Sequence, residues 1–433
     1  MRARLSRGRV LRRLMSRVLR DARGVLTTIV LTTTSPRADR VAIATLNADE
    51  ENATVIAVQL AQREPGVSID FLSPDPDLAR RAVAEAARCL DAPVPSRISY
   101  AQDRYTNLLR AFTVSARTFT THVVLPGVDR SGRRVHTHLT HGSGPKPDTT
   151  FRGPTTVLAS ITDAWVPAQL REYRLPPTTR VVREMPRLEV MRRAAGDRTV
   201  LARMGLDSDH PVVVWAPTYR AIERAGGEIR VSGTRFTAGH PAAAEHPHSH
   251  PAGAERVAGS TPLRTIDDLR ATAETNGWTC IAKPHPRDAD DLRGLGLPVF
   301  TNDDLRRCGV TAYELFGAAD LLITDYSSVF TERAELGLPF ALWCPDLDEF
   351  ASSYRGLREP LFTAMYGPAR SHTTRSILNE VLSVSARSSL NSEDFSRRSP
   401  PSGFPATSEH ATRYTRSTTH WPGRVTLDKQ AAQ

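Results

Sequence analysis

The sequence contains few cysteines, few aromatic residues and no long apolar stretch. Aromatic residues make up 6% of the chain and no RNA- or DNA-binding motif is present, which argues against a nucleic-acid partner. No uninterrupted apolar run approaches the roughly 20 residues of a membrane-spanning helix. The four cysteines are far apart and match no spacing typical of a metal or redox site: Cys89, Cys280, Cys308 and Cys344. Isolated cysteines of this kind favour a reducing, cytoplasmic setting.

What the chain does have is length and positive charge. Its 433 residues exceed what a single hydrophobic core usually supports, so two domains are expected. The formal net charge of +10 indicates an anionic partner, such as a nucleotide, a polyphosphate polymer or a membrane surface.

The first 23 residues form a strongly basic arm. Residues 1–23 hold nine arginines against a single acid, Asp21. Apolar residues recur there at helical spacing: Leu11, Leu14, Met15 and Val18. This pattern favours an amphipathic helix that lies on an anionic membrane surface. The alternatives are a disordered basic arm and a start codon assigned too early.

Alternating strand and helix patterns divide the rest of the chain into two predicted domains, residues 24–185 and 186–384. Residues 24–34 resemble a signal-peptide core, but their threonines and the lack of a clear cleavage site favour a first strand region instead. Further strands are expected over residues 41–46, 67–72, 121–126, 156–160, 212–217, 279–284, 321–324 and 340–344, and a helix over 76–91. We therefore predict an α/β fold of two Rossmann-like domains, with parallel sheets whose strand ends face a shared cleft.

Two stretches lack the apolar residues of a folded core. Residues 224–262 are rich in Gly, Pro, Ala and His, and we expect them to form a disordered insertion loop. A metal-binding role for His246, His248 and His250 is the alternative interpretation. Residues 385–433, rich in Ser, Thr, Arg and Pro, are predicted to be a disordered tail.

One stretch combines a strand, a turn and a helix start. The apolar run Leu321–Ile323 predicts a buried strand, and the following helix is expected to end at Gly337. Ser327 and Ser328 stand where the N-cap of that helix belongs. Free backbone N–H groups and the helix dipole favour an anion such as phosphate there. An ordinary capped helix is the alternative.

A second motif that could take part in catalysis or binding is HGSGPK, at residues 141–146. His141 follows a strand-like segment and is expected at the carboxyl end of that strand. Gly142 and Gly144 have no Cβ, so the backbone there can approach a ligand closely, and Lys146 can reach an anion. A purely structural histidine is the alternative.

A third motif is KPHP, at residues 283–286. Lys283 and His285 each precede a proline, which favours extended backbone, and residues two apart in an extended chain point to the same side. The motif therefore predicts an ammonium and an imidazole presented together, unless it is only a rigid surface turn. Arg220, after the strand at 212–217, offers a planar fork for phosphate or for a surface salt bridge.

If these motifs converge on one cleft, they suit the transfer of a phosphate-linked group from a nucleotide. The set contains two histidines, His141 and His285. An imidazole in general titrates near neutral pH and can take a proton from an attacking hydroxyl. Cations and N–H dipoles can hold the charge of a diphosphate.

The ordered motifs resemble those of the CDP-glycerol glycerophosphotransferase family, the teichoic-acid polymerases and primases. The resemblance covers roughly residues 120–384 and rests on HGSGPK (141–146), MPRLEV (185–190), APTYR (216–220), KPHP (283–286) and TDYSS (324–328). Residues 354–356 and 367–368 resemble the closing arginine–glycine and glycine–proline elements of that family.

The resemblance implies a GT-B architecture whose C-terminal domain holds most of the donor nucleotide. It implies a reaction without metal or cofactor, in which an acceptor hydroxyl attacks the phosphorus that bears glycerol and CMP leaves. His141 would act as the base and His285 would steady the diphosphate. Ser327 and Ser328 would hold phosphate oxygens, and Arg220, Lys283 and Arg355 would supply positive charge. Asp325 has two open interpretations, a hydrogen-bond acceptor for the donor's polyol or a residue that fixes the turn.

The sequence departs from the family pattern at two places. Ser143, Gly144 and Pro145 stand where Thr-Pro-Leu is usual, and the histidine-rich insertion is not a family feature. The donor's polyol, glycerol or ribitol, and the acceptor, lipid-linked or glycan, therefore stay open. The expected location is the inner face of the cell membrane. The alternative functions are a GT-B glycosyltransferase that uses a sugar nucleotide and a non-catalytic basic protein that binds an anionic polymer or membrane.

Overall fold

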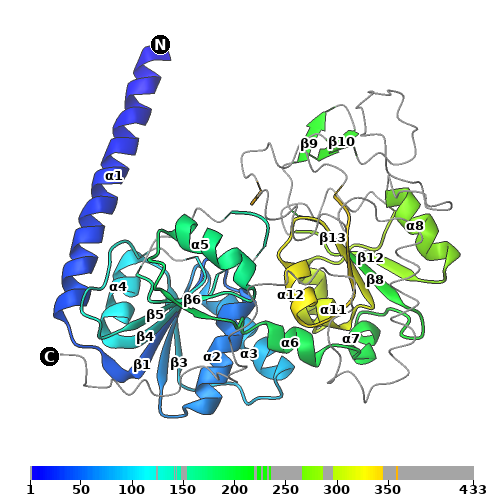
Figure 1. Cartoon of the computed structure of the whole chain (residues 1–433), viewed down its shortest axis with the longest axis horizontal. Coiled ribbons are helices and arrows are strands. Elements are labelled where there is room, and N and C mark those ends of the chain that lie inside the picture. Colours follow the sequence, from blue (N-terminus) through cyan, green and yellow to red (C-terminus); the bar gives the residue numbers. More distant parts are fainter. Residues whose placement is uncertain are drawn as a thin grey trace, which may run out of the picture.

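The structure, a computed structural model, shows two parallel sheets surrounded by helices, with one long helix that projects from the first (Figure 1). It describes residues 2–122, 125–140, 142, 144–147, 154–218, 222–225, 228–231, 234–235, 266–285, 296–344 and 357–358. We call the first sheet with its helices the first unit, and the second sheet with its helices the second unit.

The first sheet has seven parallel strands in the order β3-β2-β1-β4-β5-β6-β7. They are β1 (Arg37–Ala44), β2 (Ser68–Ser73), β3 (Ile98–Gln102), β4 (Ser115–Thr120), β5 (Val135–His138), β6 (Val157–Ala159) and β7 (Arg180–Val182). The strand order reverses between β1 and β4, and ligands of such sheets bind beyond the carboxyl ends of the strands at this reversal.

The second sheet has four parallel strands in the order β12-β8-β13-β14. They are β8 (Val212–Ala216), β12 (Thr279–Ala282), β13 (Leu321–Thr324) and β14 (Phe340–Leu342). Val299 pairs with Ala282 in parallel and extends the sheet beyond β12. The order reverses here between β8 and β13, so the second unit has its own switch point. The predicted α/β fold with two sets of parallel strands is confirmed.

Helices cover the sheets because alternate strand residues are apolar on both faces. Val41 and Ile43 of β1 pack into the largest hydrophobic cluster, whereas Ala42 and Ala44 pack with Phe112 on the other face. The described helices are α1 (Arg2–Thr33), α2 (Glu51–Arg63), α3 (Pro76–Cys89), α4 (Tyr105–Val114), η1 (Asp163–Trp165), α5 (Val166–Tyr173), α6 (Leu188–Arg193), α7 (Arg198–Arg203), α8 (Ile266–Thr275), α10 (Asn302–Arg307), α11 (Ala312–Ala318) and α12 (Val329–Glu335). The largest cluster continues from α2 and α3 through α6 and α11 to β8, so the two units share part of their core.

The prediction of a strand region over residues 24–34 is wrong, because α1 runs from Arg2 to Thr33. The threonines are accommodated by bonds to the preceding turn: the Thr28 and Thr33 hydroxyls each donate to a carbonyl four residues earlier, at 2.8 Å. Thr27 and Leu31 are fully buried against the first unit. Tertiary packing therefore outweighs the strand preference of threonine. The helix predicted within residues 1–23 is part of α1, rather than a disordered basic arm.

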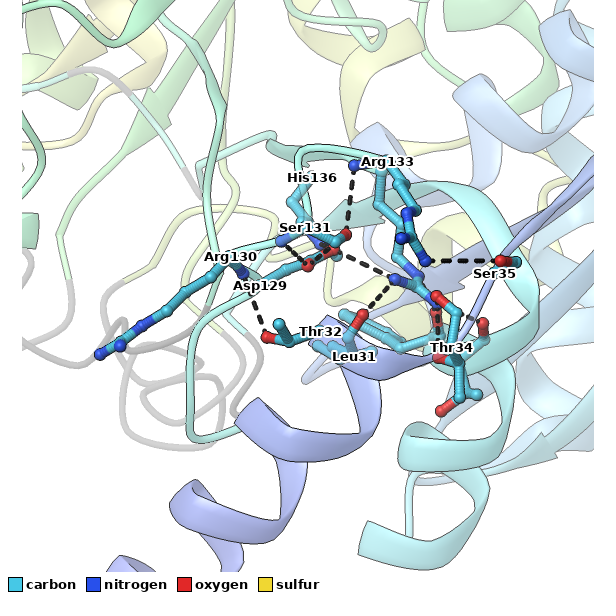
Figure 2. A network of polar contacts seen from close by, with 12 residues as sticks. Leu31, Thr32, Thr34, Ser35, Asp129, Arg130, Ser131, Arg133 and His136 are labelled. Atoms are coloured by element: carbon cyan, nitrogen blue, oxygen red, sulfur yellow. Dashed lines mark hydrogen bonds and ion pairs between the residues drawn. The ribbon is translucent and has the colours of Figure 1, made fainter.

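A buried arginine, Arg134, fixes the carboxyl end of α1 to the first unit. Figure 2 shows the polar contacts around this end of α1, with Leu31 and Thr32 on the helix and Asp129 and His136 on the first unit. Arg134 donates to Leu31 O at 2.5 Å and to Thr34 O at 3.1 Å, where a helix leaves carbonyls without intrahelical donors. Asp129 balances the charge of Arg134 at 3.3 Å and also contacts His136 Nε2 at 3.3 Å. The backbone N–H of Arg130 donates to the Thr32 hydroxyl. These contacts attach the carboxyl end of α1 to the first unit.

Two further predictions need correction. The strand expected over residues 121–126 instead ends at Thr120, and His122 lies in a bend. At the start of the predicted loop 224–262, three short strands pair as an antiparallel sheet: β9 (Ile222–Ala225), β10 (Glu228–Val231) and β11 (Thr234–Arg235). Ile222 of β9 pairs with Val231 of β10 in this sheet. Residues 236–262 and 385–433 lie outside the described residues.

Candidate functional site

The switch point of the second sheet is held by Asp325, which directly follows β13. Its Oδ1 accepts hydrogen bonds from the backbone N–H groups of Thr218 (2.9 Å) and Tyr326 (2.6 Å). The hydroxyl of Thr324 donates to Ala216 O at 2.6 Å, which ties the ends of β8 and β13 together a second time. Asp325 is buried. These contacts are those of a residue that fixes the turn, one of its two predicted roles.

The helix that follows this turn begins as predicted. Ser328 is the N-cap residue of α12, but its side chain makes no cap hydrogen bond, and Ser327 Oγ accepts only a long bond of 3.5 Å from Val329 N. Both serines are half-buried. The side chain of an ordinary N-cap serine accepts a hydrogen bond from a backbone N–H of the first helical turn, and the Ser328 side chain does not.

We call residues 141–146, the HGSGPK motif after β5, the glycine loop. Its two glycines, Gly142 and Gly144, lie directly against Ser328. A Cβ atom at Gly142 would overlap the Ser328 side chain, and one at Gly144 would lie 2.9 Å from Ser328 Cα. No residue larger than glycine fits at either position without movement of the backbone. The loop after β5 and the start of α12 come from different units, so this contact brings two of the predicted motifs together.

Arg187, which follows β7, carries a buried charge beside this contact. Its guanidinium forms ion pairs with Glu332 of α12 and, at 3.3 Å, with Glu50 of the first unit. It also lies 4.6 Å from the centre of the Tyr313 ring. Burial acts against the charge of Arg187, but Glu332 and the other acidic neighbours raise its pKa above the ordinary value. A Cβ at Gly142 would lie 3.4 Å from Arg187 Nη2, so a fixed cation stands next to the glycine loop.

Lys283 is buried at the end of β12, and its Nζ donates to Pro284 O at 3.1 Å. Burial lowers the pKa of Lys283 to about 8, although the charges of Glu51 and Asp49 oppose that shift. An unfolded lysine holds its proton to about pH 10.4, so the burial costs stability at neutral pH, and this cost shrinks as the pH rises above 8. His285, two residues later, is exposed, so the ammonium and the imidazole of the motif lie in different environments.

Glu51 is the first residue of α2 in the first unit, and its charge interacts with that of Lys283. Its Oε1 accepts a 3.4 Å bond from Tyr313 N, and its Oε2 is buried with no hydrogen-bond partner among the described residues. Burial raises the pKa of Glu51 to about 8, and the charge of Arg187 opposes that shift. Since a free glutamic acid titrates near pH 4.3, this carboxyl lowers stability as the pH rises from there to 8.

The predicted site residues divide into three groups. The structure brings the glycine loop, Ser327 and Ser328 together, and the half-buried Lys146 belongs to the same loop. Asp325 follows β13 and Lys283, with the exposed His285 two residues later, follows β12; these two strands lie on either side of β8 in the second sheet. His141, Arg220 and Arg355 lie outside the described residues, as do His246, His248 and His250. Among the residues that the structure describes, no cluster of His, Cys, Asp or Glu could hold a metal, and no helix is long and apolar enough to cross a membrane.

Sequence reasoning assigned no role to Arg187, Glu332, Glu51 or Arg358. Arg187 lies in the MPRLEV stretch, which resembles a family motif. This position is the one feature of the sequence that could have indicated a role for Arg187. Arg358 is buried and bonds to Glu172 and to the carbonyl of Gly144. Nothing in the local sequence separates it from the many exposed arginines of the chain.

The chain is similar to a known family and to known structures. Residues 173–399 match the family model described as CDP-Glycerol:Poly(glycerophosphate) glycerophosphotransferase. A search of curated proteins finds no match. The wall teichoic acid polymerase TagF is similar in structure, with 16% identity and a TM-score of 0.51 over 87% of this chain and 91% of that chain. A histidine-to-alanine variant of TagF gives 16% identity and a TM-score of 0.53 over 90% and 91%. At such identity the likeness concerns the fold alone, which is of the GT-B type.

Proposed function

The chain belongs to the CDP-glycerol:poly(glycerophosphate) glycerophosphotransferase family, and we propose that it transfers glycerol phosphate, or a related polyol phosphate, from a CDP-linked donor to a hydroxyl of a lipid-linked or glycan acceptor. CMP is the second product, and the acceptor belongs to a teichoic-acid-like cell-wall polymer. The contact of Gly142 and Gly144 with Ser328 supports this proposal most, because it joins the motif that contains His141 to the start of α12.

In the proposed reaction the acceptor oxygen bonds to the phosphorus that carries the polyol. The bond from that phosphorus to the bridging oxygen breaks, and CMP leaves with that oxygen. His141 takes the proton of the acceptor hydroxyl, and His285 steadies the diphosphate. Imidazole suits the first role because it is largely neutral at pH 7 and becomes charged when it accepts a proton.

Positive charge at the strand ends of the second unit stabilises the diphosphate of the donor and the CMP that leaves in this proposal. Lys283 is buried, so its charge acts through a medium of lower polarity than water and is felt more strongly. Lys146, Arg220 and Arg355 add charge, and the hydroxyls of Ser327 and Ser328 donate to phosphate oxygens. Asp325 keeps these groups in place through the turn that it fixes. We propose that these groups replace a metal and that the reaction needs no cofactor.

A donor panel tests the proposal directly. Purified protein is given CDP-glycerol, CDP-ribitol, CMP-sialate or UDP-sugars with a lipid or glycan acceptor, and nucleotide release is measured with and without a chelator. We expect CMP from one of the two CDP-polyols, at a rate that the chelator leaves unchanged. Preference for a UDP-sugar would instead identify a GT-B glycosyltransferase, and release of no nucleotide would favour a non-catalytic binding protein.

We also propose that α1 holds the protein on the inner face of the cell membrane. The helix docks through Thr27 and Leu31, and exposed apolar residues follow each other at helical spacing on its other side: Met15, Val18, Leu19, Val25, Leu26 and Ile29. Arg20 and Arg23 are exposed too, and the nine arginines of residues 1–23 complement anionic lipid headgroups. An apolar stripe beside a cationic surface is typical of a helix that lies in a membrane interface.

Replacing two valines of this stripe should weaken binding to anionic vesicles. Val18 and Val25 are 61% and 62% exposed, and together their transfer into lipid contributes roughly 2–3 kcal/mol. We therefore expect the double variant Val18→Gln and Val25→Gln to bind phosphatidylglycerol vesicles about 30- to 150-fold more weakly. The matched control changes Val94 and Val128, which are 60% and 45% exposed outside α1, to glutamine. Equal vesicle binding by both variants would exclude the stripe as the membrane contact.

A further inference from the structure

Arg358 follows β14 of the second unit in the chain, but its side chain contacts the first unit. Its Nε and Nη2 donate to the two carboxylate oxygens of Glu172, on α5, at 2.8 and 2.6 Å. Its Nη1 donates to the carbonyl of Gly144, and its backbone N–H donates to Pro145 O at 2.7 Å. The guanidinium also lies 5.6 Å from the centre of the Trp165 ring. One residue thus joins the glycine loop, α5 and the segment after β14.

The geometry of this contact differs from that of a surface salt bridge. The side chains of Arg358 and Glu172 are only 5% and 17% exposed, and the paired bonds between them are of the bidentate type, which is both strong and directional. The carboxylate therefore fixes the plane of the guanidinium, and the remaining Nη1 is directed at Gly144. All three guanidinium nitrogens bond to oxygens of the protein, which argues against a direct role in holding substrate.

The glycine loop is consequently held at two points by parts of the chain that follow the first unit. Ser328 packs against Gly142 and Gly144, and Arg358 binds the carbonyls of Gly144 and Pro145. Trp165, beneath the guanidinium, packs with Tyr326 and Phe330 of the second unit. If the two units moved apart, the loop would lose both supports at once.

We propose that Arg358 is a positioning residue: by binding the carbonyls of Gly144 and Pro145, it holds the glycine loop in the geometry required for phosphate transfer while the two units are in contact. Glu172 orients Arg358 and has no other part in the reaction. The inference rests on the proposed function, since the loop contains His141. Arg358 and Glu172 would link the contact between the two units to the placement of the base, His141. Lys283, Ser327 and Ser328 act on the donor instead.

Kinetics of Arg358→Gln test this role. Misplacement of a reacting group by about 1 Å can cost about 10²-fold in rate, so we expect kcat for CMP release to fall about 100-fold while the donor KM changes less than about threefold. Arg358→Lys should recover little, because lysine cannot bridge Glu172 and the Gly144 carbonyl together. Glu172→Gln should slow the reaction similarly, and the double variant should be little slower than either single one, since both act through the same contact.

Arg117→Gln is the matched control. Arg117 forms a bidentate pair with Glu64 at 2.7 and 2.6 Å in the first unit. Their side chains are 16% and 28% exposed, and among the described residues the hydrogen bonds of the Arg117 side chain go to Glu64. Its loss should leave kcat within about threefold of the parent protein. If Arg358→Gln had no larger effect on kcat than Arg117→Gln, or raised the donor KM in proportion to the loss of kcat/KM, the positioning role would be wrong.

Hydrogen exchange gives a readout that does not depend on activity. In the full chain, Arg358→Gln should accelerate amide exchange in a peptide over residues 141–147 at least tenfold and leave β8 and β13 unchanged. Unchanged exchange in that peptide would overturn the inference even if activity fell. If the parent protein released no nucleotide from any donor, the proposed function would fail, and the exchange experiment would still decide whether Arg358 fixes the loop.

Discussion

Replacing His141 by alanine is expected to lower the rate of CMP release about 10³-fold, and replacing His285 about 10²- to 10³-fold. The first figure is the usual contribution of a general base, and the second is that of one group that stabilises developing charge. Since His285 is exposed, its loss should change the free energy of unfolding by less than about 0.5 kcal/mol. Steady-state rates and urea unfolding of each variant measure the two effects separately.

His210 provides the control for these variants. It is an exposed histidine of the second unit, placed before β8 and bonded to Asp207 at 2.8 Å. His210→Ala should release CMP at the parent rate. If His141→Ala or His285→Ala kept more than a third of that rate, the corresponding histidine would have no part in the chemistry. A selective rise of the donor KM in His285→Ala would support its assignment to the diphosphate.

The central strands were predictable because they are short apolar runs bounded by turn residues. This holds for β1, β8 and β13, whose residues pack on both faces of their sheets. The edge strand β3 (Ile98–Gln102) escaped prediction because its residues are mostly half-buried or exposed, and a half-polar run gives no such signal. The helical end of α1 escaped because threonine-rich residues favour strands unless packing and the contacts of Arg134 decide otherwise.

The site was predictable where it depends on motif order and not where it depends on burial. Two glycines beside a strand end and two serines before a helix are local patterns, and the structure places Gly142 and Gly144 against Ser328. The burial of Lys283 depends on the residues that pack around β12, so it could not be predicted from the KPHP motif alone. Arg187 and Arg358 find their carboxylates 145 and 186 residues away along the chain, so no local pattern marks either arginine.

The largest effect on stability is expected at Arg187. Its replacement by methionine leaves Glu332 and Glu50 buried without their cation, and breaking a buried ion pair from one side costs about 3–5 kcal/mol. Urea unfolding should therefore show a markedly lower midpoint for Arg187→Met. Arg192→Met is the control: Arg192 pairs with Glu189 on the surface of α6, and exposed pairs contribute no more than about 1 kcal/mol.

A double variant separates the support of the fold from the chemistry. Apolar replacement of both partners of a buried ion pair is often neutral or stabilising, so Arg187→Met with Glu332→Leu should recover most of the lost stability. The double variant should still release CMP slowly, because it lacks the cation next to Gly142. A double variant that was as unstable as Arg187→Met would show that Glu332 is not the partner that makes the single change costly. One that was both stable and fully active would show that Arg187 supports the fold only.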